Sequence, residues 1–389
     1  MRRIRHILVV ALALAPALAH AGDDEQPATV LRGKTFKLRS EDGKSSLGIS
    51  GRLQFRWDAE YKRGSGSGSE LTDRFSLPAA RFTFDGNIHG DLEYKLQLDV
   101  GKGDPALKDY FLEKPIAGGG KITVRAGQFK KPFSRQQITS SGSLQMLTRS
   151  ISDKFSGSGR DLGVMVSNRF EKSPEGLEWA LGVFNGTGEA GAITCPVPAA
   201  GSTATSVTCA RSNIPGDIGP QAALRVGYNK GKIKGYSESD LEGGPLRIAV
   251  AASYLIDFKD FKSEAFEHRV GIDFAVKKCG FSATGAAYVV DKSDADGSFD
   301  FAKQYAAFGQ VGFFLVPSKY EFTARVSRNP QLGSAAAPQN QNQLEILAGF
   351  NWFGAGHAWK LQTQAGVIHD TGDAGGTDKV IGAQAQVVF

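Results

Sequence analysis

The 389-residue sequence is poor in the residue types that hold metals or serve as nucleophiles. It has three cysteines and six scattered histidines, and no Cys-x-x-Cys motif occurs, so no metal site is expected. A Gly-x-Ser-x-Gly elbow, which would present a nucleophilic serine, is also missing. These absences argue against an enzyme, and no feature of the sequence implies a cofactor.

Long apolar runs are missing too, apart from one near the start of the chain. Residues 7–19 are apolar, follow three arginines within the first five residues and lead into the small-residue site Ala19-His20-Ala21. The run is shorter than the ~20 residues of a membrane-spanning helix. It predicts a secretory signal peptide over residues 1–21, cleaved after Ala21. A short periplasmic segment is expected over residues 22–45.

The charge of the secreted chain is nearly balanced. Loss of the three arginines of the signal peptide leaves 43 basic against 40 acidic residues. The charges are spread regularly, without a basic tail or patch, so no nucleic-acid partner is expected. The directions in which the charged side chains point therefore matter more than the net charge.

Two of the three cysteines lie close together. Cys195 and Cys209 fall in a stretch rich in Pro, Gly, Ser, Thr and Ala, and an oxidising compartment would allow them to pair. They are the candidate disulfide. Cys279 follows two lysines and precedes Gly280, which is typical of a tight turn, and a free thiol without a role is expected there.

Apolar and polar residues alternate over residues 47–62, and this alternation predicts a strand with one apolar and one polar face. The apolar positions are Leu47, Ile49, Leu53, Phe55, Trp57, Ala59 and Tyr61. Such a strand is much longer than the usual ~5–6 residues of globular proteins. A bilayer explains the length, because a tilted spanning strand needs ~9–11 residues.

The alternation recurs about sixteen times along the chain, most clearly over residues 91–100, 246–256 and 266–276. We therefore predict an all-β fold, a transmembrane antiparallel β-barrel of about sixteen strands over residues 46–389. A soluble β-sandwich or propeller fits less well, because the charged faces of such long strands need water. The terminal Phe389 is typical of the last strand of bacterial outer-membrane proteins.

Short links alternate with longer polar links. Residues 85–90 and 277–280 are short links, whereas 130–160 and 185–219 are long. Membrane barrels are built in this way, with short periplasmic turns and long extracellular loops. The link from Asn229 to Pro245 breaks the pattern, because it is long where a short turn is expected.

Motifs in one part of the chain resemble those of a known family. Residues 125–134 read Arg-Ala-Gly-Gln-Phe-Lys-Lys-Pro-Phe-Ser, and Arg149-Ser150 and Gly159-Arg160 follow. This pattern resembles the phosphate-selective porin family, most sharply over residues 79–184. The resemblance implies a sixteen-stranded homotrimeric porin whose long third loop folds into the pore. Thr148 stands where the family has an acidic residue.

Basic residues gather in the expected constriction loop, residues 130–160. Rings of Arg and Lys make a pore prefer anions, and Arg adds bidentate geometry. Arg149 and Arg160 match family motif positions and are the first candidates for anion binding. The other candidates, in the loop and on the strands, are Lys130, Lys131, Arg135, Lys154, Arg125, Arg81 and Arg56.

Alternatives stay open for this loop. It could lie outside the barrel as a solvated segment, and Arg149 and Arg160 could pin it to carboxylates of the wall. Acidic residues predicted to face the lumen balance the basic residues that face it. An anion preference would therefore come from the loop, or from segregation of the two signs on opposite walls.

The expected function is passive diffusion of small anions, such as phosphate-type oxyanions, across the bacterial outer membrane. The expected partners are these anions, the lipid of the outer membrane and two further copies of the chain. Alternatives are a weakly selective general porin or, in a different class, a barrel adhesin or an outer-membrane enzyme.

Overall fold

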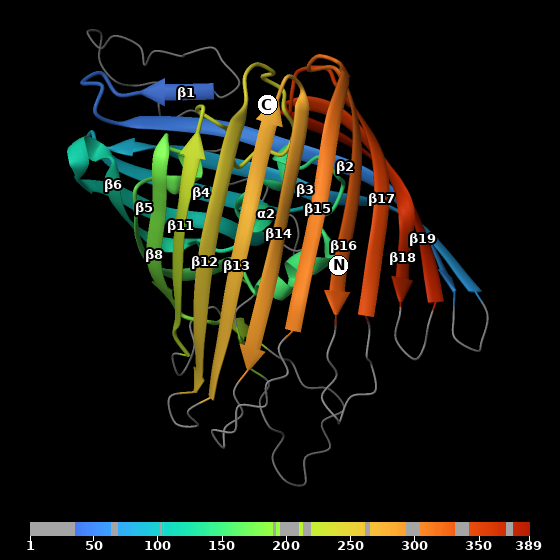
Figure 1. Cartoon of the computed structure of the whole chain (residues 1–389). Coiled ribbons are helices and arrows are strands. Elements are labelled where there is room, and N and C mark those ends of the chain that lie inside the picture. The colour runs from blue at the N-terminus through green and yellow to red at the C-terminus, as the bar shows by residue number, and fades with distance from the viewer. Residues whose placement is uncertain are drawn as a thin grey trace, which may run out of the picture.

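The computed structural model shows a chain folded almost entirely into one closed β-sheet (Figure 1). None of its described helices is long and apolar enough to cross a membrane. The predicted signal peptide and the candidate disulfide of Cys195 and Cys209 lie outside the residues that the structure describes. The described residues are 36–63, 69–101, 103, 105–189, 192–194, 210–212, 219–260, 265–292, 304–330, 342–370 and 376–389.

Sixteen antiparallel strands pair in a ring, each with its neighbour in the sequence, and the last strand pairs with the first. The strands of the ring are β2 (Ser46–Arg63), β3 (Ser69–Ile88), β4 (Leu92–Asp99), β5 (Ala106–Ala117), β6 (Ile122–Lys130), β7 (Arg160–Ser167), β8 (Gly176–Phe184), β11 (Gln221–Lys230), β12 (Arg247–Asp260), β13 (Ala265–Lys278), β14 (Phe281–Lys292), β15 (Gln304–Val316), β16 (Tyr320–Pro330), β17 (Asn342–Phe353), β18 (Trp359–Asp370) and β19 (Gly376–Val388). The prediction of a closed barrel of about sixteen strands is confirmed.

Smaller elements accompany the ring. β1 (Phe36–Arg39) pairs with the start of β2, and β9 (Ala192–Thr194) and β10 (Ala210–Ser212) form a separate hairpin. The short helices are η2 (Gly118–Gly120), α2 (Arg135–Ile138), η3 (Ser141–Ser143), η4 (Ile151–Ser156) and η5 (Phe170–Lys172). Three of them, α2, η3 and η4, lie in the link between β6 and β7, so this link has structure of its own.

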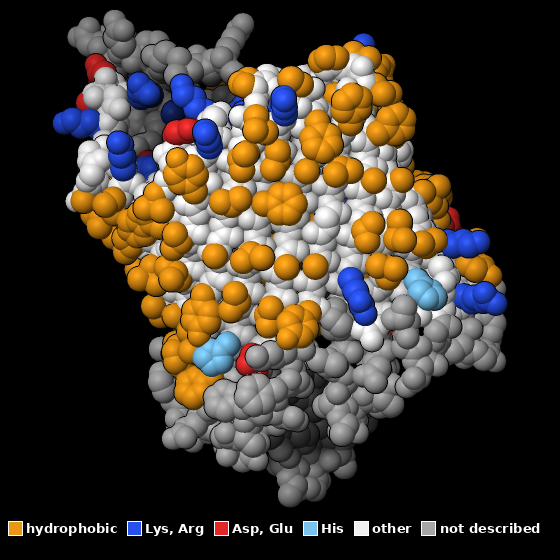
Figure 2. Space-filling model, viewed as in Figure 1, with side chains coloured by type: hydrophobic (Ala, Val, Ile, Leu, Met, Phe, Trp, Pro, Cys, Tyr) orange, Lys and Arg blue, Asp and Glu red, His pale blue; other side chains and the backbone are white. Residues whose placement is uncertain are grey.

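The two faces of the wall differ as the alternation predicts. On β11, Leu224, Val226 and Tyr228 are exposed on the outside, while Arg225 between them is fully buried on the inside. Figure 2 shows apolar side chains spread over the outer face, with its few charged side chains near the two ends. This wall is suited to a lipid bilayer outside and to polar contents inside.

The ring closes beside the last residue of the chain. The backbone of Phe389 exchanges two hydrogen bonds with that of Gly51, at N···O distances of 2.6 and 3.0 Å. A Cβ atom on Gly51 would lie 2.3 Å from the Phe389 ring, so a larger residue would displace the ring. Gly51 therefore makes room for the terminal aromatic side chain at the seam of the barrel.

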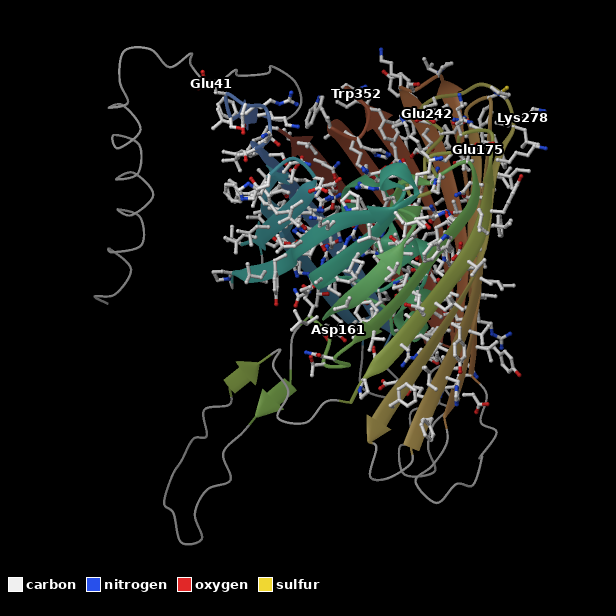
Figure 3. All side chains as sticks on the ribbon, turned by 90° about the vertical axis from the view of Figure 1, so that its left-hand side faces the viewer. Glu41, Asp161, Glu175, Glu242, Lys278 and Trp352 are labelled. Carbon is white, nitrogen blue, oxygen red and sulfur yellow. The ribbon has the colours of Figure 1, made fainter. Side chains whose placement is uncertain are left out.

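Short turns, except for the longer link between β11 and β12, join the strands at one end of the barrel, the end at which Phe389 lies, and we call this the turn end. The turn between β13 and β14 consists of Cys279 and Gly280, both with positive φ, as a tight hairpin turn requires. Cys279 is free and exposed. Figure 3 shows Glu175, Glu242 and Lys278 at the turn end and Asp161 toward the opposite, loop end.

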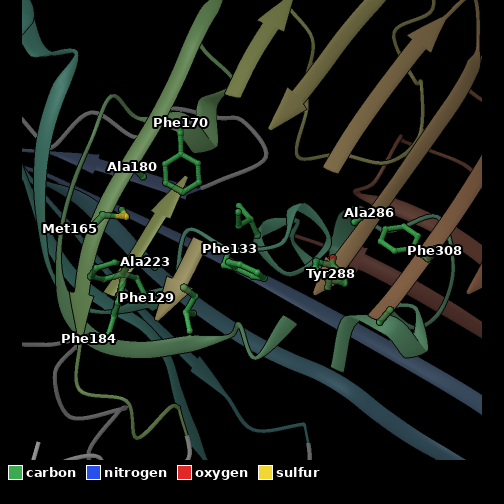
Figure 4. Packing of buried hydrophobic residues seen from close by; sticks show 13 residues of the cluster. Phe129, Phe133, Met165, Phe170, Ala180, Phe184, Ala223, Ala286, Tyr288 and Phe308 are labelled. Atoms are coloured by element: carbon green, nitrogen blue, oxygen red, sulfur yellow. The ribbon is translucent and has the colours of Figure 1, made fainter. Parts of the chain in front are cut away.

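An apolar cluster fills part of the barrel interior (Figure 4). Phe133 and Ile138, from the link between β6 and β7, pack there with wall residues such as Tyr288 of β14 and Phe308 of β15. The rings of Phe133 and Tyr288 lie 6.1 Å apart. One side of the lumen is therefore occupied by packed side chains.

Candidate pore and constriction

The link between β6 and β7, residues 131–159, contacts the polar inner face of the barrel, mainly on the side away from β2–β7; we call it the inserted loop. The Gln145 side chain donates to Glu321 of β16 and to Ser282 of β14, both over 2.7 Å. Its backbone carbonyl accepts from Asn351 and Gln362, on β17 and β18. The loop thus spans the barrel from its own strands to the opposite wall.

Local chemistry explains how the inserted loop turns. Pro132 and the positive φ of Ser134 end the extended run of β6, and the Ser134 hydroxyl then accepts from the backbone N–H of Gln137 to start α2. Arg149 donates to the carbonyl oxygens of Gln136 and Thr139, both over 2.9 Å. Arg149 thereby joins the second half of the loop to the first.

A carboxylate also holds the loop together. Asp153 accepts from the hydroxyl of Ser134 over 2.9 Å and from the side chain of Gln137 over 2.5 Å, and Arg149 lies 3.9 Å away. Burial raises the pKa of the Asp153 carboxyl above its usual value, although Arg149 and these two donors favour the charged form. Asp153 therefore takes up a proton at a higher pH than an ordinary aspartate.

Three cavities lie between the inserted loop and the wall of β2–β7, and one of them is also lined by the link after β11, the turn between β17 and β18, and β19. The loop-side cavity, of about 1040 Å³, reaches from Asp58 and Arg74 to Arg81. The turn-side cavity, of about 580 Å³, reaches from Arg81 to His357. A side cavity of about 240 Å³ lies beside Lys95. Arg81 lines all three cavities and so marks their junction.

Positive charge predominates around these cavities. Among the described residues that line the loop-side cavity, seven are cationic and three are carboxylates. The cationic residues are Arg56, Arg74, Arg81, Lys108, Lys130, Arg149 and Arg160, and the carboxylates are Asp58, Asp99 and Asp153. The turn-side cavity is lined by Arg52, Arg81 and Lys234 against Glu242. The lining of these two cavities is therefore predominantly basic.

Some of these cations are neutralised and some are not. Arg81 is paired with Asp99, over 2.7 Å, and Arg160 with Asp109, over 2.6 Å. Four others, Arg52, Arg56, Arg74 and Lys130, make no salt bridge within the described part of the chain. Arg52 donates to Ser140 and Ser141, Arg56 donates to Gln384 and the Leu147 carbonyl, and Lys130 donates to the carbonyls of Ile138 and Thr139.

The nine residues predicted to bind anions fall into three groups. Arg56, Arg81, Lys130, Arg149 and Arg160 lie together around the loop-side cavity. A second group is held in buried pairs: Arg125 with Glu113 and Glu171, Arg135 with Asp273, and Lys131 with Gln221. Of these three, only Arg125 lines one of the cavities, the side cavity. The side chain of Lys154 lies outside the described part of the structure.

Some residues that line the cavities were not predicted as site residues. Arg52 belongs to the same alternating strand as Arg56, so its inward direction was visible in the sequence, but its position beside Ser140 and Ser141 was not. Lys108 and Arg74 also line the loop-side cavity. In the described residues no group of His, Cys, Asp and Glu is arranged to hold a metal ion.

The comparisons with known proteins agree with this architecture. The family model of the phosphate-selective porins O and P matches residues 49–194. No curated protein sequence matches the chain significantly. Several solved structures share its fold at low sequence identity.

An anion-selective porin from Comamonas acidovorans has a TM-score of 0.55 and 13% identity, over 89% of this chain and 100% of that chain. The outer-membrane channel DcaP of Acinetobacter baumannii has a TM-score of 0.53 and 14% identity, over 90% and 99%. OmpT, an outer-membrane protein of Vibrio cholerae, has a TM-score of 0.53 and 11% identity, over 92% and 100%. The chain is thus a sixteen-stranded barrel with the fold of outer-membrane porins, and its residues 49–194 match the phosphate-selective porin O and P family.

Proposed function

We propose that the chain is a channel of the bacterial outer membrane through which small anions diffuse passively, with phosphate-type oxyanions as the favoured solutes. The inserted loop forms the constriction, and anions pass between this loop and the wall of β2–β7. The family match and the fold shared with an anion-selective porin support this class of function. The chain works as a homotrimer, and the Vibrio cholerae protein of the same fold is described in a trimer form.

The observation that carries the proposal is the presence of cations without carboxylate partners along the cavities. Arg52, Arg56 and Lys130 have no carboxylate partner there, because their hydrogen bonds go to neutral hydroxyl, amide and carbonyl oxygens. Uncompensated positive charge in a narrow, low-dielectric passage concentrates anions. Hydroxyl groups beside these cations, from Ser140 and Ser141, are good donors to the oxygens of phosphate.

The arrangement also suits release of the solute. Conduction needs several moderate contacts, because one tight site would trap the ion. Arg81 at the junction and Arg160 beside it keep their carboxylate partners, so each attracts an anion less strongly than a free guanidinium would. An anion would contact Arg56 and Lys130 first, then Arg81 and finally Arg52. At each step it would exchange one cationic partner for the next.

A weakly selective general porin is the second candidate. Asp58, Asp99 and Asp153 line the loop-side cavity, and carboxylates in a pore favour cations. The excess of cations in the same lining favours the anion channel. Arg, Lys and Ser predominate among the polar residues that line the two larger cavities, which suits transport better than catalysis.

Two neighbouring lysines provide the test. Lys130 lines the loop-side cavity, whereas Lys131 is buried against Gln221 of β11 and lines none of the three cavities. In planar bilayers with a salt gradient, wild-type protein should give reversal potentials of the anion-preferring sign, and added phosphate should reduce the chloride current. Lys130→Gln should lower the anion preference, and Lys131→Gln should leave it unchanged.

Each contrary result has a definite meaning. Reversal potentials of the cation-preferring sign would reject the anion preference but keep the porin. Equal effects of the two lysine variants would place the passage elsewhere in the barrel. The absence of conductance steps from folded wild-type protein would reject the channel itself.

A further inference from the structure

The link between β11 and β12, residues 231–246, folds into the turn end of the barrel; we call it the inserted turn. The sequence already marks it as too long for its place between neighbouring strands. Ile233, Glu238, Ser239 and Asp240 are all buried, although three of the four are polar. A polar segment is stable in such a place only when its groups find partners inside.

Several residues attach the inserted turn to the barrel wall. Ile233 packs against the alanines of β12 and β13 at positions 249 and 275. Ser239 donates to Glu321 of β16 over 3.0 Å. Asp240 accepts from the backbone N–H of Gly280 over 2.9 Å. The turn is therefore fixed to the side of the barrel that the apolar cluster occupies.

The inserted turn also binds the inserted loop, mainly through hydrogen bonds of Glu238. The backbone N–H of Glu238 donates to the carbonyl of Ser143 over 3.1 Å, and its carboxylate accepts from the backbone N–H of Gln145 over 2.8 Å. The same carboxylate accepts from the side chains of Gln136 and Gln310. Glu238 thus joins the turn, the first half and the centre of the loop, and strand β15 at one point.

A second contact joins the two segments on the other side of α2. The carbonyl of Gly235 accepts from Arg135 over 2.9 Å, and the ring of Tyr236 lies 5.0 Å below the Arg135 guanidinium. The Tyr236 hydroxyl donates to Glu178 and accepts from Arg225 on the wall. The loop is therefore held by the turn at Arg135 as well as at Ser143 and Gln145.

We propose that the inserted turn sets the selectivity of the channel by holding the inserted loop against β13–β18, with Glu238 as the positioning residue. This closes the half of the barrel that contains Glu321, Glu345 and Asp273, so solutes are confined to the basic passage along β2–β7. The inference rests on the proposed function, since it concerns the same passage. Lys234, Ser237 and Glu242 of the turn also line the turn-side cavity, so the turn forms part of its exit.

Replacing Glu238 removes a charge and also removes contacts, and these two changes should shift the anion preference in opposite directions. Loss of a negative charge from the lumen should by itself raise the anion preference. Loss of the Glu238 contacts should instead free the loop and admit water along the carboxylates of the other half. Glu238→Ala and Glu238→Gln should therefore lower the anion-to-cation permeability ratio by about two-fold and increase the single-channel conductance.

Glu242→Gln is the matched comparison. Glu242 lies on the same turn and its loss changes the charge equally, but it pairs with Arg247 and Lys234 and not with the inserted loop. This variant should shift the permeability ratio toward anions. If Glu238→Ala does not assemble, Glu238→Gln decides the question, because it keeps the side-chain volume and one acceptor oxygen.

The outcomes separate this inference from the proposed function. If folded Glu238 variants behave like Glu242→Gln or like wild type, Glu238 does not position the loop and the inference is overturned, while anion preference of the wild type stands. If the wild type prefers cations, the proposed solute is wrong. A conductance increase in the Glu238 variants would then still support the positioning role, and an unchanged conductance would refute it.

Discussion

The Arg160 guanidinium reaches across β6 to the Asp109 carboxylate, with Nε of Arg160 2.6 Å from Oδ1 of Asp109. Lys95 lies 3.2 Å from the other carboxylate oxygen. The carboxylate is thus shared by two cations, and both side chains of the Arg160–Asp109 pair are largely buried. The residue that the sequence marked as a main candidate for anion binding is partly neutralised by the wall.

We therefore expect different results from single and double replacement at this pair. Arg160→Gln should lower the anion preference and destabilise the barrel by about 3–5 kcal/mol, because it leaves a buried carboxylate with one partner fewer. Arg160→Gln combined with Asp109→Asn should recover most of the stability. Urea unfolding in detergent and reversal potentials would measure the two effects. Equal stability of the single and double variants would show that the pair is not coupled.

The junction of the cavities at Arg81 gives a second prediction. Arg81→Ala should widen the passage and remove a cation, so conductance should rise by about two-fold while the anion preference falls. Arg81→Trp should fill the junction and reduce conductance. Arg74 lines only the loop-side cavity, so Arg74→Ala should change conductance less. Single-channel recordings would show this, and a larger effect at Arg74 would move the narrowest point toward the loop end.

The fold was predictable because its signal is local. On β2 the side chains of Leu53 and Phe55 face out and those of Arg52 and Gln54 face in, and the same period of two recurs in other strands of the ring, such as β11 and β15. Such a pattern needs no knowledge of distant partners. The number of strands and the inward direction of the charged residues followed from it.

The site was predictable only in part, because its partners are distant in the sequence. Lys130 and Lys131 are adjacent and chemically alike, yet one faces the passage and the other is buried against Gln221. Arg135 forms a salt bridge with Asp273, which lies more than a hundred residues further along the chain. No local pattern distinguishes a lysine that meets solutes from a lysine that supports the fold.

The inserted turn escaped prediction for a related reason. Its polar residues Ser237, Glu238 and Asp240 are typical of a solvated loop, and only its unusual length set it apart. The turn folds inward because its polar side chains find hydrogen-bond partners inside the barrel, such as the backbone N–H groups of Gln145 and Gly280. These partners belong to segments that are distant in the sequence, and no local pattern relates them to the inserted turn.

The raised pKa of Asp153 predicts a pH effect on selectivity. Burial favours the protonated form of this carboxyl, so it takes up a proton at a higher pH than an ordinary aspartate. Asp153 lines the loop-side cavity, and its protonation removes a negative charge there. The anion preference should therefore rise as the pH falls toward the usual pKa of aspartate.

Asp153→Asn isolates this effect. The variant should show an anion preference at neutral pH close to that of the acidified wild type, and its preference should change less with pH. Asp58 lines the same cavity, so Asp58→Asn should leave the steep part of the pH dependence in place. Reversal potentials over a pH series would measure this, and identical curves for wild type and Asp153→Asn would assign the titration to another group.

The buried charges in the closed half of the barrel give the last prediction. Arg225 is fully buried, with Nη1 2.7 Å from Oδ2 of Asp273 and Nε 3.1 Å from Oε1 of Glu178. Asp273 and Glu178 are buried as well, so Arg225→Met would leave Glu178 without its nearest cation and Asp273 with Arg135 alone. Removing one member of such a group costs about 3–5 kcal/mol, because a buried charge loses its partner.

A matched control is available on the outer face. Arg328 of β16 is exposed, and no salt bridge involves it within the described residues, so Arg328→Met should change the stability by less than about 0.5 kcal/mol. Urea unfolding of both variants in the same detergent would give the comparison. Because Arg225 also contacts Tyr236 of the inserted turn, Arg225→Met should raise conductance as Glu238→Ala does. A destabilised variant with wild-type conductance would mean that the turn is held by its remaining contacts, and that Arg225 supports the wall alone.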